Sequence, residues 1–225
     1  MKKKILLIGG SSKVGQCMIN NLDQKKYLIH STYFKKKILK KGITQHKLNL
    51  NDKLSNQDFI NKIQNIDFII FLSGVLKGKS LQNFSDEEIG ENFNINFLSQ
   101  IILLKNILKN QKNNCLLVFL SSISGRRGSY DPIYAASKGA MISFIKSVSK
   151  WESPKIRSIG ICPGLINNTK MYKSFTKERL KKLKIQNPNK SFVDANNLAK
   201  IIIDVIQPHW KHANGSIIDV NGGEF

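Results

Sequence analysis

The stretch KILLIGG, residues 4–10, begins the recognisable structure of this 225-residue chain. Its apolar run from Ile5 to Ile8 predicts a strand that is buried on both faces, and its two glycines predict a turn. The chain continues as SSKVG up to residue 15, and a helical pattern starts near Val14. A glycine turn between a buried strand and a helix lets backbone amides approach a phosphate, although such a turn is also common without a ligand.

Apolar runs and helical patterns alternate from this turn to the end of the chain. The runs predict strands at 4–10, 27–34, 43–50, 66–74, 115–122, 156–164 and 215–223. Apolar residues at helical spacing predict helices at about 14–23, 54–63, 86–109, 132–151 and 194–206. This order predicts an α/β fold, namely a three-layer, doubly wound parallel sheet of about seven strands in a single domain, 1–225. The lysine-rich segment 167–190 lacks a clear strand, and we interpret it as a substrate lid.

The composition restricts the classes of partner. The net charge of +21 comes almost entirely from lysines spread along the chain. Without arginine clusters, zinc spacings or aromatic platforms, general surface charge is favoured over nucleic-acid binding. Cys17, Cys115 and Cys162 are too widely spaced for a metal site or a disulfide framework, which favours reduced thiols in the cytoplasm. The apolar run after MKKK is too short for a signal sequence, and no run is long enough to span a membrane.

The stretch YAASK, residues 134–138, contains the strongest candidate for catalysis. Tyr134 and Lys138 are four residues apart and therefore share one face of a helix. A nearby ammonium stabilises a phenolate, so we expect Lys138 to lower the pKa of Tyr134 and make it a general acid–base. Ser122 follows the fifth predicted strand, at the sheet edge where such folds bind ligands, and it could hold a substrate carbonyl. A Tyr-x-x-x-Lys pair alone is common and often only structural.

The end of the second predicted strand, STYFKKK at 31–37, bears on the choice of cofactor. A site for NAD usually carries an acid about 20 residues past the glycines, where it binds the ribose hydroxyls. Here no acid occurs between Asp23 and Asp52, and Lys13 and the lysines at 35–37 would attract a 2′-phosphate. We therefore expect NADP(H) in preference to NAD(H), although the lysines alone could be part of the general background.

Taken together, these motifs resemble the short-chain dehydrogenase/reductase family over the whole chain. SSISG at 121–125 followed by YAASK resembles the family's serine and Tyr-x-x-x-Lys elements, and NINF at 94–97 resembles its asparagine element. The resemblance implies a catalytic set of Ser122, Tyr134, Lys138 and Asn96. In such a set the tyrosine protonates the carbonyl oxygen, the serine orients it, the lysine holds the nicotinamide ribose, and the asparagine positions a water that relays protons.

The patterns and the resemblance together predict the remaining contacts. For the cofactor we expect Gly9, Ser11, Ser12, Lys13, Val14, Gly15, Phe34, Lys35, Asn49, Leu50, Ser73, Gly74, Tyr134, Lys138, Pro163, Gly164 and Ile166. For the substrate we expect Ser122, Tyr134 and Arg126. Arg126 and Arg127 could anchor an anion or simply face solvent in their loop. No metal site is predicted.

The chain departs from the family pattern at several points. Lys13 stands where the glycine turn usually has its middle glycine, and FLSG at 71–74 retains only Gly74 of the usual Asn-Asn-Ala-Gly. Asn49 stands where an aspartate is usual, and Thr169 lies one place later than the usual threonine. A dinucleotide-binding protein without catalytic activity would be the alternative reading of these departures.

The resulting prediction is an NAD(P)H-dependent oxidoreductase that interconverts a ketone and a secondary alcohol. A 3-oxoacyl group on an acidic carrier protein and a sugar or sugar nucleotide are both candidate substrates. The family resemblance also implies a homodimer or homotetramer assembled through the helices predicted at 86–109 and 132–151.

Overall fold

A computed structural model describes residues 1–224, with the side chains at 53–56 left out. The predicted strands are all present. They are β1 (Lys3–Ile8), β2 (Tyr27–Tyr33), β3 (Thr44–Lys47), β4 (Phe68–Phe71), β5 (Cys115–Leu120), β6 (Ile156–Pro163) and β7 (Ile217–Val220). They form one parallel sheet in the order β3-β2-β1-β4-β5-β6-β7. The chain therefore has the predicted doubly wound topology, and the strand order reverses between β1 and β4.

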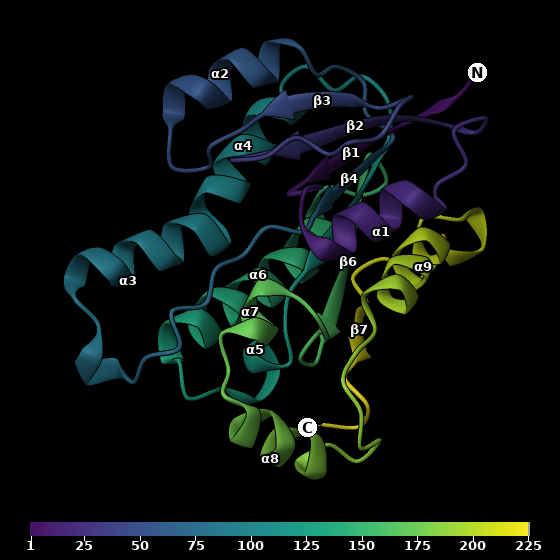
Figure 1. Cartoon of the computed structure of the whole chain (residues 1–225). Coiled ribbons are helices and arrows are strands. Elements are labelled where there is room, and N and C mark those ends of the chain that lie inside the picture. Colours follow the sequence, from purple (N-terminus) through teal and green to yellow (C-terminus); the bar gives the residue numbers. More distant parts are fainter. Residues whose placement is uncertain (225) are drawn as a thin grey trace.

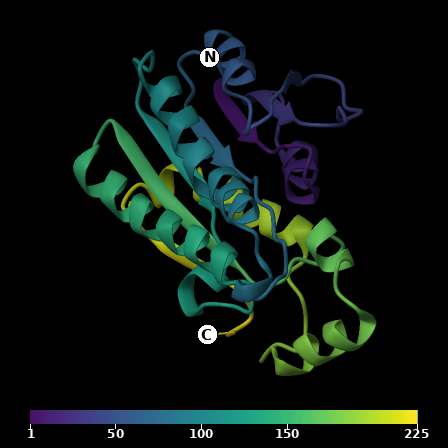
Figure 2. The ribbon, with the colours of Figure 1, turned by 90° about the vertical axis from the view of Figure 1, so that its left-hand side faces the viewer.

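Helices cover both faces of the sheet (Figure 1). They are α1 (Lys13–Asn21), α2 (Lys53–Asn61), α3 (Asp86–Phe93), α4 (Ser99–Leu108), α5 (Ser124–Arg127), α6 (Pro132–Trp151), α7 (Lys170–Lys173), α8 (Lys177–Gln186) and α9 (Ala195–Val205). The helix predicted at 54–63 corresponds to α2, whose side chains up to residue 56 are among those left out. Figure 2 shows α7 and α8, in light green, standing to one side of the sheet and the helices that cover it.

The alternation of side chains along β1 explains the two-sided core. Ile5 and Leu7 pack with α1 and α9, whereas Leu6 and Ile8 face α2, α4 and α6. All four are completely buried. Their burial removes apolar surface from water on both faces, and each side chain of this size contributes about 1.5–3 kcal/mol. An unbroken apolar strand is stable only in such a covered, parallel sheet.

The helix predicted at 86–109 is wrong in one respect, because it is not a continuous α-helix. Between α3 and α4 the backbone forms a π-helical turn over Asn94–Leu98. π-Turns inside α-helices are frequent at functional sites. This one contains Asn96, and its contacts are described below.

Two half-buried histidines join β2 to β3. Nδ1 of His30 lies 3.2 Å from Nε2 of His46, and the rings are stacked with their centres 5.5 Å apart. Burial lowers the pKa of His30 to about 4, with smaller contributions from the charges of His46 and Lys4. Burial and the charge of Lys62 lower the pKa of His46. The folded protein therefore binds fewer protons than the unfolded chain just below pH 6.5.

We expect the free energy of unfolding to fall by about 1–2 kcal/mol between pH 7 and pH 5, after allowance for the partial exposure of both rings. The sign follows from the lowered pKa values, because acid favours the state that takes up protons. Urea denaturation of the wild type and of a His30→Gln, His46→Gln double variant at both pH values measures the effect. An equally steep fall in the double variant would contradict this origin, and the exposed His212→Gln variant is the control.

In residues 1–224, no helix is long and apolar enough to cross a membrane. Nor does any group of histidine, cysteine and acidic residues in the described part of the chain have the arrangement of a metal site.

Candidate active site

The candidate site is a cavity of about 1210 Å³ that extends from the glycine turn after β1 to α7 and α8. It lies at the carboxyl ends of the strands and includes the place where the strand order reverses, which is where open α/β sheets bind ligands. Single small-molecule pockets usually measure about 300–1,000 Å³. The cavity is therefore large enough for a dinucleotide together with a substrate.

The glycine turn forms a closely packed cradle at one end of the cavity. Gly9 has a φ of +82°, and a Cβ atom there would lie 2.5 Å from Oγ of Ser73. Thr32 Oγ1 accepts a hydrogen bond from the Gly9 amide (2.8 Å), and Ser12 caps α1 by accepting from the Gly15 amide (3.1 Å). The first turn of α1 carries no acid. A glycine cradle at the N-terminus of an acid-free helix suits the diphosphate of a dinucleotide.

Lys13 is the first residue of α1 and has an exposed side chain at the edge of this cradle. The helix begins normally despite the missing middle glycine, because Ser12 supplies the cap. Lys13 adds a positive charge beside the amides, so the turn still fits an anionic cofactor.

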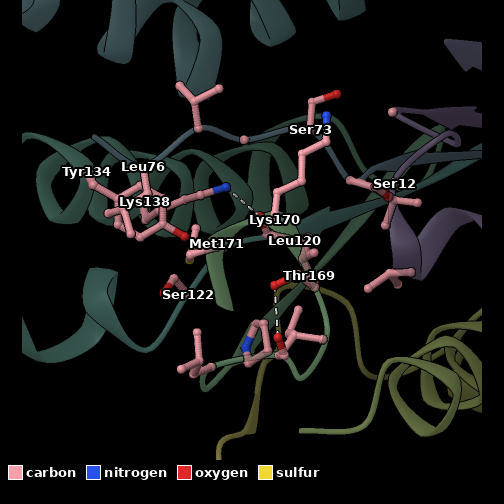
Figure 3. A pocket seen from close by; sticks show the side chains of 18 of the residues that line it. Ser12, Ser73, Leu76, Leu120, Ser122, Tyr134, Lys138, Thr169, Lys170 and Met171 are labelled. Carbon is pink, nitrogen blue, oxygen red and sulfur yellow. Dashed lines mark hydrogen bonds between the residues drawn. The ribbon is translucent and has the colours of Figure 1, made fainter. Parts of the chain in front are cut away.

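Tyr134, Ser122 and Lys138 lie together at the inner wall of the cavity (Figure 3). Asp131 caps α6 by accepting a hydrogen bond from the Tyr134 amide (2.9 Å), and Pro132 occupies the first turn, so both residues set where the helix starts. The Ser121 hydroxyl donates to the Lys138 carbonyl (2.8 Å), which holds the end of β5 against α6. This contact brings the serine loop beside the tyrosine.

The expected effect of Lys138 on Tyr134 is wrong for this structure. The Lys138 ammonium donates to the Leu120 carbonyl (2.8 Å) and lies 5.9 Å from the centre of the Tyr134 ring. Burial raises the pKa of Tyr134 to about 12, against a smaller opposite effect of a hydrogen bond from Ser122. Burial also lowers the pKa of Lys138 to about 8. Desolvation therefore dominates both shifts, and the sequence pattern could not show how deeply the two groups are buried.

Asn96 is completely buried and does not line the cavity itself. Its side-chain oxygen accepts from the Val75 amide (2.7 Å), and its amide donates to the Val75 carbonyl (2.9 Å) and to Asn92 (2.7 Å). A Cβ atom on Gly74 would lie 3.3 Å from the Lys138 ammonium and 3.5 Å from the Asn96 side-chain oxygen. The hydrogen bonds of Asn96 thus hold the loop that follows β4 directly beside Lys138.

Gln100 is a buried residue of this region that sequence reasoning missed. Its side-chain amide donates to the backbone carbonyls of Ser73 (3.2 Å), Ile95 (2.9 Å) and Asn96 (3.2 Å). It therefore ties the π-helical turn to the loop that lines the cavity. No motif marks it, because its partners are carbonyl groups exposed by an irregular backbone.

Most of the predicted contacts line the cavity. These are Gly9, Ser11, Ser12, Lys13, Val14, Phe34, Asn49, Leu50, Ser73, Gly74, Ser122, Tyr134, Lys138, Pro163, Gly164 and Ile166. Gly15 packs on Gly10 behind the turn, and Lys35 lies at the surface with its ammonium 6.0 Å from the Phe34 ring.

The predicted substrate contact of Arg126 is not supported by the geometry. Its guanidinium forms a fork with the carboxylate of Asp219, with distances of 3.2 and 2.6 Å, and it does not line the cavity. Arg127 does line the cavity, but it pairs with Glu224. Both arginines are therefore neutralised by acids near the C-terminus, which lie far away in the sequence.

The segment 167–190 supplies further lining residues, of which only Thr169 had a signal in the sequence. Thr169, Lys170, Met171, Lys173, Phe175, Arg179 and Leu183 all line the cavity. Thr169 caps α7 and donates to the Ile166 carbonyl (2.9 Å). The aromatic edge contact between Tyr172 and Phe192, with ring centres 5.4 Å apart, holds α7 against the chain that returns to α9.

The comparisons with known proteins agree with this geometry. The sequence profile of the short chain dehydrogenase family matches residues 3–180. The chain belongs to this family and is an NAD(P)-dependent oxidoreductase that acts between carbonyl and alcohol groups. The predicted resemblance is therefore confirmed.

Two curated relatives cover nearly the whole chain. The chain is 26% identical over 226 residues to a 3-oxoacyl-acyl-carrier-protein reductase, FabG, of Buchnera aphidicola, covering 98% of this chain and 87% of the relative. It is also 26% identical to carbonyl reductase family member 4 of Xenopus laevis, covering 99% and 98%. Among solved structures, a short chain dehydrogenase family protein from Francisella tularensis has a TM-score of 0.91 at 21% identity, covering 100% of this chain and 99% of that chain. That likeness confirms the fold.

Proposed function

We propose that the protein is an NADP(H)-dependent ketone reductase with Tyr134 as the proton donor. The observation that carries this proposal is the buried cluster of Ser122, Tyr134 and Lys138 at the wall of a cavity that also contains the glycine cradle. A tyrosine whose pKa is raised to about 12 remains protonated at neutral pH. At neutral pH the phenol is therefore in the protonated form, which is the form that reduction of a carbonyl needs.

Each side chain then has a distinct task. NADP(H), when bound, supplies the hydride. Ser122 orients the carbonyl oxygen of the substrate, and Tyr134 gives that oxygen its proton from Oη. Lys138 places a positive charge below the site, and the pKa of about 8 indicates that this charge is lost as the pH rises through that value. Asn96 holds the Val75 backbone, and with it the adjacent Gly74, in place beside Lys138.

The preference for NADP(H) is supported by charge at the end of β2. Phe34 lines the cavity, and Lys35, Lys36 and Lys37 follow it with no acid in this stretch. A 2′-phosphate would meet cations and no repelling carboxylate there. The positive charge of the exposed loop after β2 thus favours the phosphorylated dinucleotide.

The substrate class and the assembly are further parts of the proposal. The names of the Buchnera and Xenopus relatives favour a 3-oxoacyl thioester or another ketone over a sugar. Exposed apolar side chains support a homodimer or homotetramer, since Leu98 and Ile102 lie on the outer face of the 86–109 segment and Trp151 ends α6. We also propose a cytoplasmic location, a lid over 167–190 and no nucleic-acid partner.

A thermal-shift titration tests the cofactor site. NADP⁺ at about 100 times its Kd should stabilise the fold by about 2.7 kcal/mol, or roughly 5–11 °C in Tm for a chain of this size. NAD⁺ at the same concentration should give a clearly smaller shift, and a Lys35→Glu, Lys36→Glu variant should narrow the difference. Equal shifts with both dinucleotides would contradict the preference. No shift with either would favour a protein whose altered turn no longer binds a dinucleotide.

A further inference from the structure

The charged side chains that line the cavity are not balanced. Each acid is already engaged: Glu91 pairs with Lys77 (2.7 Å), Glu224 pairs with Arg127, and Asp131 accepts from the amides of Tyr134 and Gly78.

The cations of the lid have no such partners. Lys170, Lys173 and Arg179 all line the cavity, and no carboxylate among the described side chains forms an ion pair with any of them. This part of the cavity therefore carries positive charge that is available to an anionic ligand.

Arg179 is held in place by two aromatic rings. Its guanidinium lies 4.9 Å from the centre of the Phe175 ring and 5.6 Å from the centre of the Tyr130 ring. Such stacking orients the flat guanidinium while its N–H groups stay free to donate. Arg179 is exposed and belongs to α8, whereas Tyr130 belongs to the loop before α6. The contact thus ties the lid to the segment that leads into Tyr134.

The position of Arg179 separates it from the cofactor end of the cavity. In Figure 3, Ser12 and Ser73 lie on the opposite side of the view from Tyr134, and the Lys170 side chain extends toward Ser73. Lys170 is therefore better placed for the cofactor. Arg179 contacts the ring of Tyr130, four residues before Tyr134, and is therefore better placed for the substrate.

We propose that Arg179, supported by Lys173, binds an oxyanion, either a carboxylate or a phosphate, on the part of the substrate that is remote from the reacting carbonyl. This inference rests on the proposed reductase function and specifies the substrate class of the same site. The fork of an arginine matches the paired oxygens of a carboxylate or phosphate, and it is pre-oriented here by the two rings. The anion anchor that the sequence suggested at Arg126 is thereby reassigned to the lid.

Matched pairs of ketones test the anchor. One pair is a methyl ketone with a terminal carboxylate on a flexible alkyl chain and its methyl ester. The second pair consists of a methyl ketone that carries a terminal phosphate and the same ketone with a terminal alcohol in place of the phosphate. In Arg179→Gln, kcat/KM should fall about 10- to 100-fold for the preferred charged ketone and less than about twofold for its neutral partner. The pair with the larger effect identifies the oxyanion.

Two further variants separate the anchor from general effects. Arg179→Lys keeps the charge without the fork and should restore only part of the loss. Lys182→Gln removes one charge from the same helix at a position that does not line the cavity, and it should change neither pair. A loss for both members of a pair in Arg179→Gln, or an equal loss in Lys182→Gln, would overturn the proposal.

Binding measured without turnover distinguishes this inference from the proposed function. Calorimetry with NADP⁺ present gives the Kd of each ketone for the wild type and for Arg179→Gln. Charge-dependent binding that is lost in the variant, without any turnover in the wild type, would contradict the reductase proposal and support the anchor. Turnover of both ketones with the same Kd in both proteins would contradict only the anchor.

Discussion

Replacing Tyr134 with phenylalanine is expected to lower kcat for ketone reduction by about 10²–10⁴-fold, the usual contribution of a general acid. The variant keeps the ring and its packing in α6 and loses only the hydroxyl that would protonate the substrate oxygen. Because that hydroxyl interacts with Ser122 and not with the glycine turn, the Kd for NADP⁺ should change little. NADPH consumption with a reducible ketone measures the rate, and the thermal shift with NADP⁺ measures cofactor binding.

Tyr172→Phe is the matched control for this variant. Tyr172 lies on α7, where its ring contacts Phe192, and it does not line the cavity. Removal of its hydroxyl should leave kcat unchanged. If Tyr134→Phe retained most of the wild-type rate, the proton would have to come from another group or from water, and the proposed role of Tyr134 would be wrong.

Replacing Gly15 with alanine is expected to lower the free energy of unfolding by about 1–3 kcal/mol and to weaken NADP⁺ binding at least about tenfold. A Cβ atom there would lie 2.4 Å from the Gly10 carbonyl oxygen and 2.6 Å from the Gly10 Cα. Both are backbone atoms, so the turn itself must move. Movement of the turn displaces the amides that would approach the diphosphate.

Gly90→Ala provides the matched control for the glycine variant. Gly90 is exposed in α3, and no described atom outside its own helix backbone and neighbouring residues lies within 4 Å of the position that its Cβ would take. Alanine there should raise stability by up to about 1 kcal/mol through its higher helix propensity. Urea denaturation and titration with NADP⁺ measure both variants. Unchanged cofactor affinity in Gly15→Ala would mean that the turn does not hold the diphosphate.

The strands were predictable because their signal is local. Four adjacent apolar residues at Ile5–Ile8 can be stable only between two covering layers, and the same logic applies to β4, β5 and β6. β3 has a weaker pattern and is shorter than predicted, at Thr44–Lys47 instead of 43–50. Its position at the sheet edge, where fewer side chains are buried, explains the weaker pattern.

The start of α6 could be predicted from the sequence, whereas the π-helical turn within 86–109 could not. Asp131 and Pro132 mark the start of α6 in the sequence, and the structure confirms that start because capping depends on neighbouring residues only. The π-helical turn was not predictable from 86–109, since it depends on hydrogen bonds from Gln100 to carbonyls of its own turn and of the Ser73 loop.

The sequence by itself determined the parallel sheet, the glycine turn, and the neighbourhood of Ser122, Tyr134 and Lys138. Each follows from residues that are close along the chain or from strand ends that meet at one edge. Only the tertiary structure decided the charges in the site. Arg126 is neutralised by Asp219, 93 residues away, and burial reverses the expected shift in the pKa of Tyr134. Arg179 is oriented by Tyr130 from another element. Such effects depend on distance and desolvation in the folded chain, and local sequence does not encode either.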